Sequence, residues 1–203
     1  MKLSVLICMY NSTANVLHNL HRLAEQMEPE VEVIVYDDCS TEDTKPIIAA
    51  CAQYGFRYLF GDSNRGEAYS RQRTMDEATG DYFTWLDADD TMTDNYIPTL
   101  LLELGPFDII ERSWKDTEGN YGPRHEWPMV NWNVWANTYR REFVKDVPFD
   151  TKRQIASDYF WLEEVMKKKP TVLFIDHAIN VYNAKNQESL THRFERGEIE
   201  ANF

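Results

Sequence analysis

The sequence lacks long apolar runs and any excess of positive charge. No apolar stretch approaches the roughly 20 residues of a membrane-spanning helix, and no signal-type cleavage sequence follows the first apolar residues. The net charge of −13 disfavours non-specific binding to a nucleic-acid backbone, although a local basic groove stays open. We expect a soluble, cytoplasmic protein with no integral membrane segment.

Cysteine is scarce and shows no pattern. The chain has three cysteines, Cys8, Cys39 and Cys51. Their number is odd and their spacing is not that of metal ligands, which favours free thiols in a reducing compartment. Hydrophobic residues make up 43% of the chain, so a globular core is expected rather than disorder. The 203 residues suit a single domain.

The first half of the chain alternates between strand-like and helix-like patterns. Strands are predicted at 3–9, 31–36, 56–60 and 82–86, and helices at 16–27, 43–54 and 66–78. This order with short connections predicts an α/β fold: a Rossmann-like, mainly parallel sheet flanked by helices on both faces.

The second half has a less regular pattern. It predicts a helix over 97–104, a strand at 107–111, a polar hairpin turn at 114–121, a short helix at 138–145, a helix at 158–169, and short strands at 172–175 and 179–182. The polar tail from Ala184 is expected to be mobile without ligand. We predict one domain over 1–203, with a first half, 1–92, and a second half, 93–203.

An acidic cluster follows the strand predicted at 82–86. Asp87-Ala88-Asp89-Asp90 places three carboxylates within four positions, and their mutual repulsion is costly unless a cation neutralises it. Oxygen ligands suit Mg²⁺ or Mn²⁺, and two carboxylates leave positions in the metal shell for substrate phosphates. The alternative is an acidic turn that caps a helix.

Other polar residues also follow predicted strands. Asn11, Asp38 and Asn64 come after the first three strands, as Asp87 comes after the fourth. Ligands of such sheets bind beyond the carboxyl ends of the strands, so the pattern favours a binding site over independent turns.

Aromatic residues gather between 127 and 139. Trp127, Trp132, Trp135 and Tyr139 suit either a packed core or a platform for the C–H face of a sugar ring, and the core is favoured about two to one for each residue.

These motifs together resemble the family 2 glycosyltransferases of the GT-A fold. The resemblance covers residues 3 to about 191 and rests on five segments: Ser4 to Asn11, Val33 to Thr41, Asn64-Arg65-Gly66 with Ser70-Arg71, Ala78 to Asp90, and Phe149-Asp150 with Ser157-Asp158-Tyr159. The chain departs from the family pattern at Cys8, where proline is usual, at Cys39, where glycine is usual, and at Ser157, where glutamate is usual.

The resemblance implies a nucleotide site. Asp38 would contact the base, the chain around Cys8 and Tyr10 would flank it, and Arg71 would approach the diphosphate or position Asp87. The other residues implied in nucleotide binding are Asn11, Asn64, Gly66 and Ala88. Residues 1–92 would then be the nucleotide-sugar-binding half, and 93–203 the acceptor-binding half.

The resemblance also implies a metal and a general base. Asp87 and Asp89 (the family's Asp-x-Asp motif) would hold Mn²⁺ or Mg²⁺, with Asp90 a further ligand or a cap. His192, or with less support His177, could complete the metal shell from the C-terminal region. Asp158 would take the acceptor proton, and at a helix start the dipole should lower its pKa.

The implied activity is metal-dependent transfer of a single sugar, with inversion, from a nucleotide-diphosphate sugar such as a UDP-sugar. The acceptor could be the hydroxyl of a glycan or lipid-linked saccharide, or a hydroxymethylated viral DNA base, which the charge disfavours. A non-catalytic nucleotide-sugar-binding module is another alternative, against which the intact Asp87, Asp89 and Asp158 count. A nucleotidyltransferase is disfavoured because Tyr10-Asn11-Ser12-Thr13-Ala14 contains no glycine or lysine to hold a triphosphate.

Overall fold

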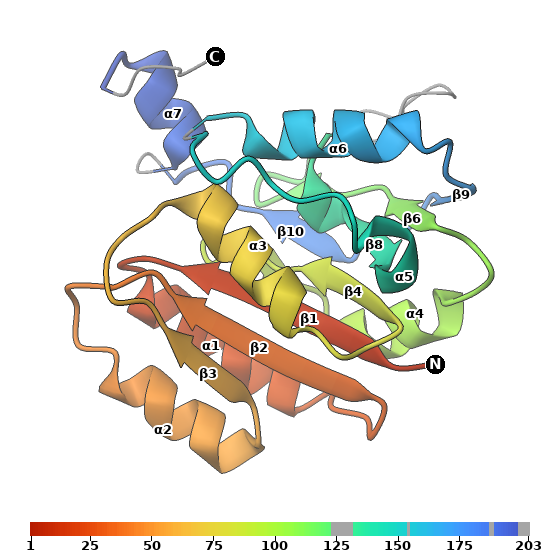
Figure 1. Cartoon of the computed structure of the whole chain (residues 1–203). Helices are drawn as coiled ribbons and strands as arrows, with labels where there is room; N and C mark the ends of the chain where they lie inside the picture. The colour runs from red at the N-terminus through yellow and green to blue at the C-terminus, as the bar shows by residue number, and fades with distance from the viewer. Residues whose placement is uncertain (123–131, 154, 187–188, 199–203) are drawn as a thin grey trace.

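The computed structural model describes residues 1–122, 132–153, 155–186 and 189–198 (Figure 1). A seven-stranded sheet forms its centre, with the strand order β3-β2-β1-β4-β8-β6-β9. The strands are β1 (Leu3–Met9), β2 (Val31–Asp37), β3 (Arg57–Phe60), β4 (Tyr82–Trp85), β6 (Ile109–Arg112), β8 (Asn137–Arg140) and β9 (Val172–Ile175). Among the described strands of this seven-stranded sheet, β8 alone runs antiparallel to its neighbours, so the mainly parallel sheet is confirmed.

Helices cover both faces of this sheet (Figure 1). The helices α1 (Thr13–Ala24), α2 (Lys45–Tyr54) and α4 (Tyr96–Glu103) pack on one face, and α3 (Glu67–Glu77), α5 (Arg141–Val144) and α6 (Ser157–Lys167) pack on the other. β1 forms a strand in the middle because its side chains are apolar toward both layers: Val5 and Ile7 face the first layer and Leu6 faces the second. Each such buried side chain contributes about 1.5–3 kcal/mol.

The order of the strands places a crevice beside β1. The chain moves outward from β1 to β2 and β3, with α1 on one face, and then returns through α3 on the other face to β4. β1 and β4 are therefore neighbours, and the order of the strands changes direction between them. Their carboxyl ends, which carry Asn11 and Asp87, open at this switch point, where α/β sheets bind ligands.

A second, three-stranded sheet was not predicted. Its order is β5 (Thr91–Met92), β10 (Asn180–Tyr182), β7 (Lys115–Asp116). The predicted hairpin turn is present, because Lys115 bridges to Tyr121 around Gly119, whose φ of 89° suits glycine. Since β5 starts directly after Asp90 and α4 only at Tyr96, the alternative in which the acidic cluster caps a helix is wrong.

The short helix predicted at 138–145 is also wrong in its first half. Thr138 pairs with Thr84 of β4 and with Ile110 of β6, so β8 is hydrogen-bonded on both sides, and α5 begins only at Arg141. Pairing with two neighbouring strands outweighs the local helical preference. In the tail, the structure places a helix, α7 (Leu190–Glu195), where none was predicted.

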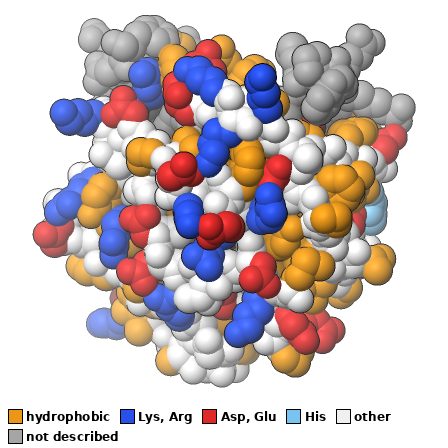
Figure 2. Space-filling model, turned by 45° about the vertical axis from the view of Figure 1, so that its right-hand side comes forward, with side chains coloured by type: hydrophobic (Ala, Val, Ile, Leu, Met, Phe, Trp, Pro, Cys, Tyr) orange, Lys and Arg blue, Asp and Glu red, His pale blue; other side chains and the backbone are white. Residues whose placement is uncertain are grey.

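The visible surface carries charged side chains of both signs (Figure 2). On the face in Figure 2, Lys and Arg side chains are interspersed with Asp and Glu. The three cysteines are free thiols. Within the described ranges, no helix has the length and apolar character needed to cross a membrane.

Candidate active site

A cleft of about 1380 Å³ lies at the carboxyl ends of β1, β2 and β4 and at the N-terminal end of α6. It is lined by every residue that the sequence assigned to the nucleotide: Cys8, Tyr10, Asn11, Asp38, Asn64, Gly66, Arg71 and Ala88. Asp87, Asp89 and Asp158 line the same cleft. The fold thus brings these segments, up to 150 positions apart in the sequence, to one site.

The end of β1 is tied to the turn after β2. Asn11 has a φ of 50°, and its side-chain oxygen accepts hydrogen bonds from the backbone N–H groups of Thr41 at 2.8 Å and Glu42 at 3.3 Å. In return the backbone N–H of Asn11 donates to Ser40 Oγ at 2.9 Å. Asn11 therefore connects the end of β1 to the turn after β2 and stabilises this part of the cleft wall.

Asp38 holds the loop before α3. Its carboxylate accepts the backbone N–H of Arg65 at 3.0 Å and that of Gly66 at 2.7 Å. Gly66 has a φ of 87°, in the region that favours glycine, and it caps the start of α3. Oδ2 accepts from both of these N–H groups, whereas Oδ1 accepts only from Arg65 and keeps a lone pair that can accept an N–H from a base.

Cys8 and Cys39 are two of the positions at which the chain departs from the family pattern, and the structure shows the conformation or environment of each. Cys39 has a φ of 64°, so it holds the left-handed conformation that the usual glycine would adopt without strain. Cys8 lines the cleft with its Sγ 3.6 Å from Thr74 Oγ1, and burial raises the pKa of its thiol to about 12. It is therefore a neutral thiol at physiological pH.

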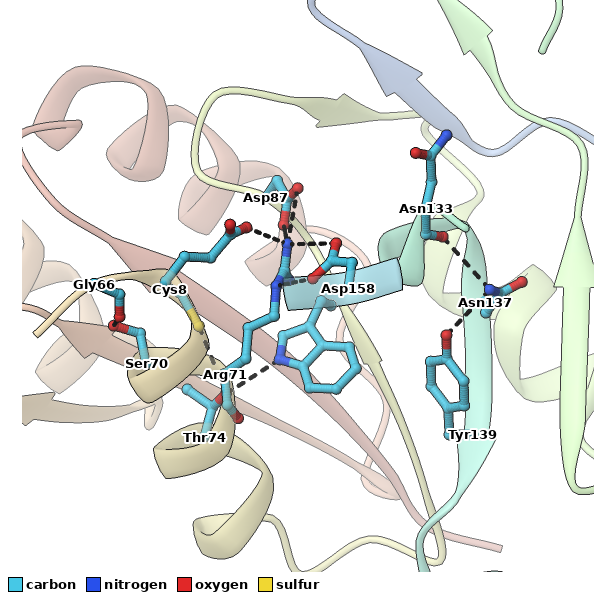
Figure 3. A network of polar contacts seen from close by, with 12 residues as sticks. Cys8, Gly66, Ser70, Arg71, Thr74, Asp87, Asn133, Asn137, Tyr139 and Asp158 are labelled. Atoms are coloured by element: carbon cyan, nitrogen blue, oxygen red, sulfur yellow. Dashed lines mark hydrogen bonds and ion pairs between the residues drawn. The ribbon is translucent and has the colours of Figure 1, made fainter. Parts of the chain in front are cut away.

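Arg71 links Asp87 and Asp158 (Figure 3). It projects from α3, is 1% exposed, and forms ion pairs with Asp87 at 3.0 Å, Asp158 at 3.0 Å and Glu67 at 2.6 Å. Its guanidinium also lies 5.4 Å from the ring of Trp85. One cation is shared by three carboxylates, which fixes their relative positions and leaves the cluster negatively charged.

Burial dominates the protonation of these carboxylates. It raises the pKa of Asp87 to about 6, against the opposing charge of Arg71. Burial likewise raises the pKa of Asp158 well above its ordinary value. Our expectation of a lowered pKa at Asp158 is wrong, because loss of hydration outweighs the helix dipole and Arg71 together.

The start of α6 also differs from expectation. Ala156, with a φ of 56°, occupies the cap position, and the helix has no side-chain cap. Ser157 is the first helical residue rather than the cap. Asp158 is in the first turn, so it is not the cap either, and its carboxylate is available to Arg71 and the cleft.

The C-terminal region contacts the acidic cluster. The backbone N–H of Asn183 donates to Asp90 at 2.8 Å, and the Asn186 side-chain N–H donates to Asp89 at 2.6 Å. Burial and the charges of Asp87 and Asp89 raise the pKa of Asp90 to about 9. Asp90 is therefore an anchor for the C-terminal segment.

Two carboxylates of the cleft, those of Asp87 and Asp89, are suited to binding a cation. Within the part of the chain that is described, no three His, Cys, Asp or Glu side chains gather closely enough to hold a metal by themselves. Asp87 and Asp89 nonetheless both line the cleft, and the negative charge around Arg71 is in excess. Two carboxylates with open positions fit Mg²⁺ or Mn²⁺ that completes its shell with diphosphate oxygens and water.

His192 is not brought to these carboxylates. Its Nδ1 lies 2.8 Å from the carbonyl oxygen of Asn186 and 3.2 Å from Ser189 Oγ, and it does not line the cleft. His177 follows β9 and does not line the cleft either. Metal ligation by either histidine stays a prediction.

Sequence reasoning missed Glu67, Asn183 and Asn186. Glu67 was detectable, since it lies four positions before Arg71 on one helix, a spacing at which opposite charges meet. The two asparagines gave no local signal, because β10 brings them to the acidic cluster only after it pairs with β5.

The chain belongs to glycosyl transferase family 2, which residues 4–165 match. It is 30% identical over 161 residues to an uncharacterized glycosyltransferase of Mycoplasma pneumoniae, covering 73% of this chain and 51% of that protein. The chain thus spans about half the length of this curated relative.

Solved structures share the fold. TarS of S. aureus in complex with UDP-GlcNAc superposes with a TM-score of 0.80 at 22% identity, covering 94% of this chain and 61% of that one. A mannosyltransferase of Pyrobaculum calidifontis in complex with GDP-Man and Mn²⁺ gives 0.73 at 16% identity, covering 97% and 61%. The fold is therefore of the GT-A type.

Proposed function

We propose that the cleft binds a nucleotide-diphosphate sugar, with a UDP-sugar as the first candidate, and transfers one sugar to an acceptor hydroxyl with inversion. The observation that carries this proposal is the position of Arg71, which contacts Asp87 on the donor side and Asp158 on the acceptor side at 3.0 Å each. A module that only bound a nucleotide sugar would not need the second carboxylate.

For the donor, Asp38 would accept an N–H of the base beside Cys8 and Tyr10. TarS binds UDP-GlcNAc and the archaeal mannosyltransferase binds GDP-Man, so the fold accommodates either base. Arg71 lines the cleft, so its guanidinium would approach the diphosphate.

Asp87 and Asp89 would hold Mn²⁺ or Mg²⁺, which when bound neutralises the charge of the diphosphate leaving group. Mn²⁺ in the mannosyltransferase complex supports this assignment. Arg71 would keep Asp87 in place through its ion pair at 3.0 Å.

Asp158 would act as the general base. Its ionised carboxylate accepts the proton of the acceptor hydroxyl while the acceptor oxygen bonds to the anomeric carbon. The bond from that carbon to the diphosphate oxygen breaks, and the diphosphate takes the electron pair. Attack opposite to the leaving group inverts the configuration, and the raised pKa makes Asp158 a stronger base once it is ionised.

The acceptor hydroxyl would belong to a glycan or a lipid-linked saccharide. A modified DNA base is less well supported, because acidic residues accompany the basic ones on the visible surface and the net charge is −13. The free thiols agree with the proposed cytoplasmic location.

Calorimetric titration of UDP-, GDP-, CDP- and TDP-sugars with Mn²⁺ tests the donor site. We expect one base to be preferred and Asp89→Asn to weaken Mn²⁺-dependent binding at least tenfold. Asp94→Asn is the matched control, since Asp94 is 99% exposed and outside the cleft. Absence of binding by all four donors, or unchanged binding by Asp89→Asn, would contradict the proposal.

A further inference from the structure

The cleft wall beside Asp158 carries an aromatic pair that the mechanism above does not use. The rings of Trp132 and Tyr159 lie with their centroids 4.4 Å apart and their planes at 38°. Both line the cleft, Trp132 is half-buried, and Tyr159 is 40% exposed. Large aromatic side chains that serve only the core are buried much more completely.

The other aromatic residues of the segment do belong to the core. Tyr139 is fully buried and packs on Trp161 at 5.0 Å. Trp135 is 6% exposed and stacks on Tyr182 with planes 6° apart. Trp127 lies outside the described residues. The core interpretation therefore holds for two of these residues, and Trp132 differs from them.

The position of the pair matches an acceptor rather than a donor. Tyr159 follows Asp158 in the first turn of α6, and both residues line the cleft. The residues proposed for the nucleotide come instead from the ends of β1 and β2 and the start of α3. An acceptor that contacted the pair would present its hydroxyl close to Asp158.

The surrounding cleft has the size and polarity for a sugar. Pockets for one drug-sized ligand measure roughly 300–1,000 Å³, so a cleft of about 1380 Å³ has room for an acceptor beside the donor. Asn133, Ser189 and Arg193 also line it and can bond hydroxyl groups. A flat apolar face next to polar groups suits a pyranose ring, which is apolar on one face and has hydroxyls at its edge.

We propose that Trp132 and Tyr159 form a platform for a sugar ring of the acceptor, so that the acceptor is a saccharide. This inference rests on the proposed glycosyltransferase function. A nucleobase could also stack on two rings, but the polyanion that carries it would approach a cleft that already holds Glu67, Asp87 and Asp158. Carbohydrate is the occupant that both the rings and the charge favour.

Saturation-transfer difference NMR in the presence of UDP and Mn²⁺ tests the platform. The probes are short oligosaccharides of glucose, galactose, mannose and N-acetylglucosamine, and an oligonucleotide containing 5-hydroxymethylcytosine. We expect Trp132→Ala and Tyr159→Leu to weaken the binding of the best saccharide at least tenfold, because leucine keeps apolar volume but has no flat face. Tyr159→Phe should stay within about twofold of the wild type.

Tyr121→Ala is the matched control, since Tyr121 is 71% exposed and lies outside the cleft. All variants should keep their affinity for UDP with Mn²⁺ and their melting temperature, which separates loss of the platform from loss of the fold.

The outcomes separate the two proposals. A wild type that binds UDP but no saccharide, or saccharide binding unchanged in both Trp132→Ala and Tyr159→Leu, overturns the platform and leaves the donor site intact. Oligonucleotide binding that depends on Trp132 overturns the saccharide acceptor in favour of a nucleobase. A wild type that binds no nucleotide overturns the proposed function, whereas the saccharide signals still decide the platform.

Discussion

At the scale of single residues, the charge of Arg71 organises the cleft. It is buried against Trp85 and pairs with carboxylates from α3, from the end of β4 and from α6. A buried guanidinium is costly unless carboxylates pair with it, so Arg71 and its three carboxylates depend on one another. Asp87 and Asp158 are therefore held in place relative to each other by one side chain.

Asp158→Asn should separate binding from transfer. The amide keeps the shape of the side chain but cannot take a proton, so we expect donor affinity within about threefold of the wild type and transfer slower by about 10²–10⁴. Initial rates of UDP release with an acceptor, together with calorimetry of the donor, check this. The control is Asp150→Asn, which removes the same charge from an exposed position outside the cleft. A normal transfer rate would remove Asp158 as the base.

At the scale of elements, the far side of the sheet is held together by Asp108 at the start of β6. Its carboxylate accepts the Thr171 backbone N–H at 2.8 Å and the Thr171 hydroxyl at 2.7 Å, next to β9, and it also pairs with Arg140 of β8. Burial raises the pKa of Asp108, but these hydrogen bonds outweigh burial and lower it below its usual value. One side chain thus connects three strands.

Asp108→Asn should lower the free energy of unfolding by about 2 kcal/mol at pH 7. The amide N–H of the new asparagine would face the hydrogen-bond donors of Thr171 and Arg140, and it cannot accept from them. Since the folded-state pKa is lowered, the carboxylate's contribution is complete above the ordinary pKa of about 3.9 and disappears as the pH falls through the folded value. Urea unfolding at pH 7 and at about pH 3 measures this. The difference between variant and wild type should shrink at the lower pH.

Asp146→Asn serves as the comparison. Asp146 pairs with Lys168 at the surface, and such exposed pairs contribute little. A loss of stability at Asp108 no larger than that at Asp146, or one independent of pH, would show that Asp108 does not connect the strands.

At the scale of the whole molecule, the cleft joins segments from both halves of the chain. β1, β2 and α3 come from residues 1–92, whereas α6, β10 and α7 come from residues 93–203. The small sheet fastens the second half to the acidic cluster, since β5 follows Asp90 and pairs with β10. A ligand in the cleft therefore stabilises the folded chain as one unit.

UDP with Mn²⁺ should stabilise the whole fold. At about 100 times the dissociation constant, binding adds about 2.7 kcal/mol to the free energy of unfolding, which for a chain of this size raises the melting temperature by roughly 5–10 °C. Differential scanning calorimetry measures the shift, and EDTA should remove most of it. A shift that survives EDTA unchanged would show that donor binding does not require the metal.

Much of the fold was predictable because it is encoded locally. Apolar runs such as Leu3–Met9 can be buried only as central strands, and the alternation of strands with amphipathic helices predicts a mainly parallel sheet. The gathering of Asn11, Asp38, Asn64 and Asp87 was predictable for a related reason, since polar residues at the carboxyl ends of such strands must meet at one edge. Arg71 and Asp158 were singled out only by the resemblance to family 2.

Long-range contacts decided what the sequence did not reveal. β8 is a strand because β4 and β6 pair with it on both sides, and the pKa of Asp158 is raised because the folded chain removes water from it. Trp132 and Tyr139 are both aromatic residues of one segment, yet only the tertiary structure leaves Trp132 at the cleft and buries Tyr139. Local sequence sets most of the elements, whereas the conformation of β8 and the burial, charge and exposure at a site depend on neighbours that are distant in the chain.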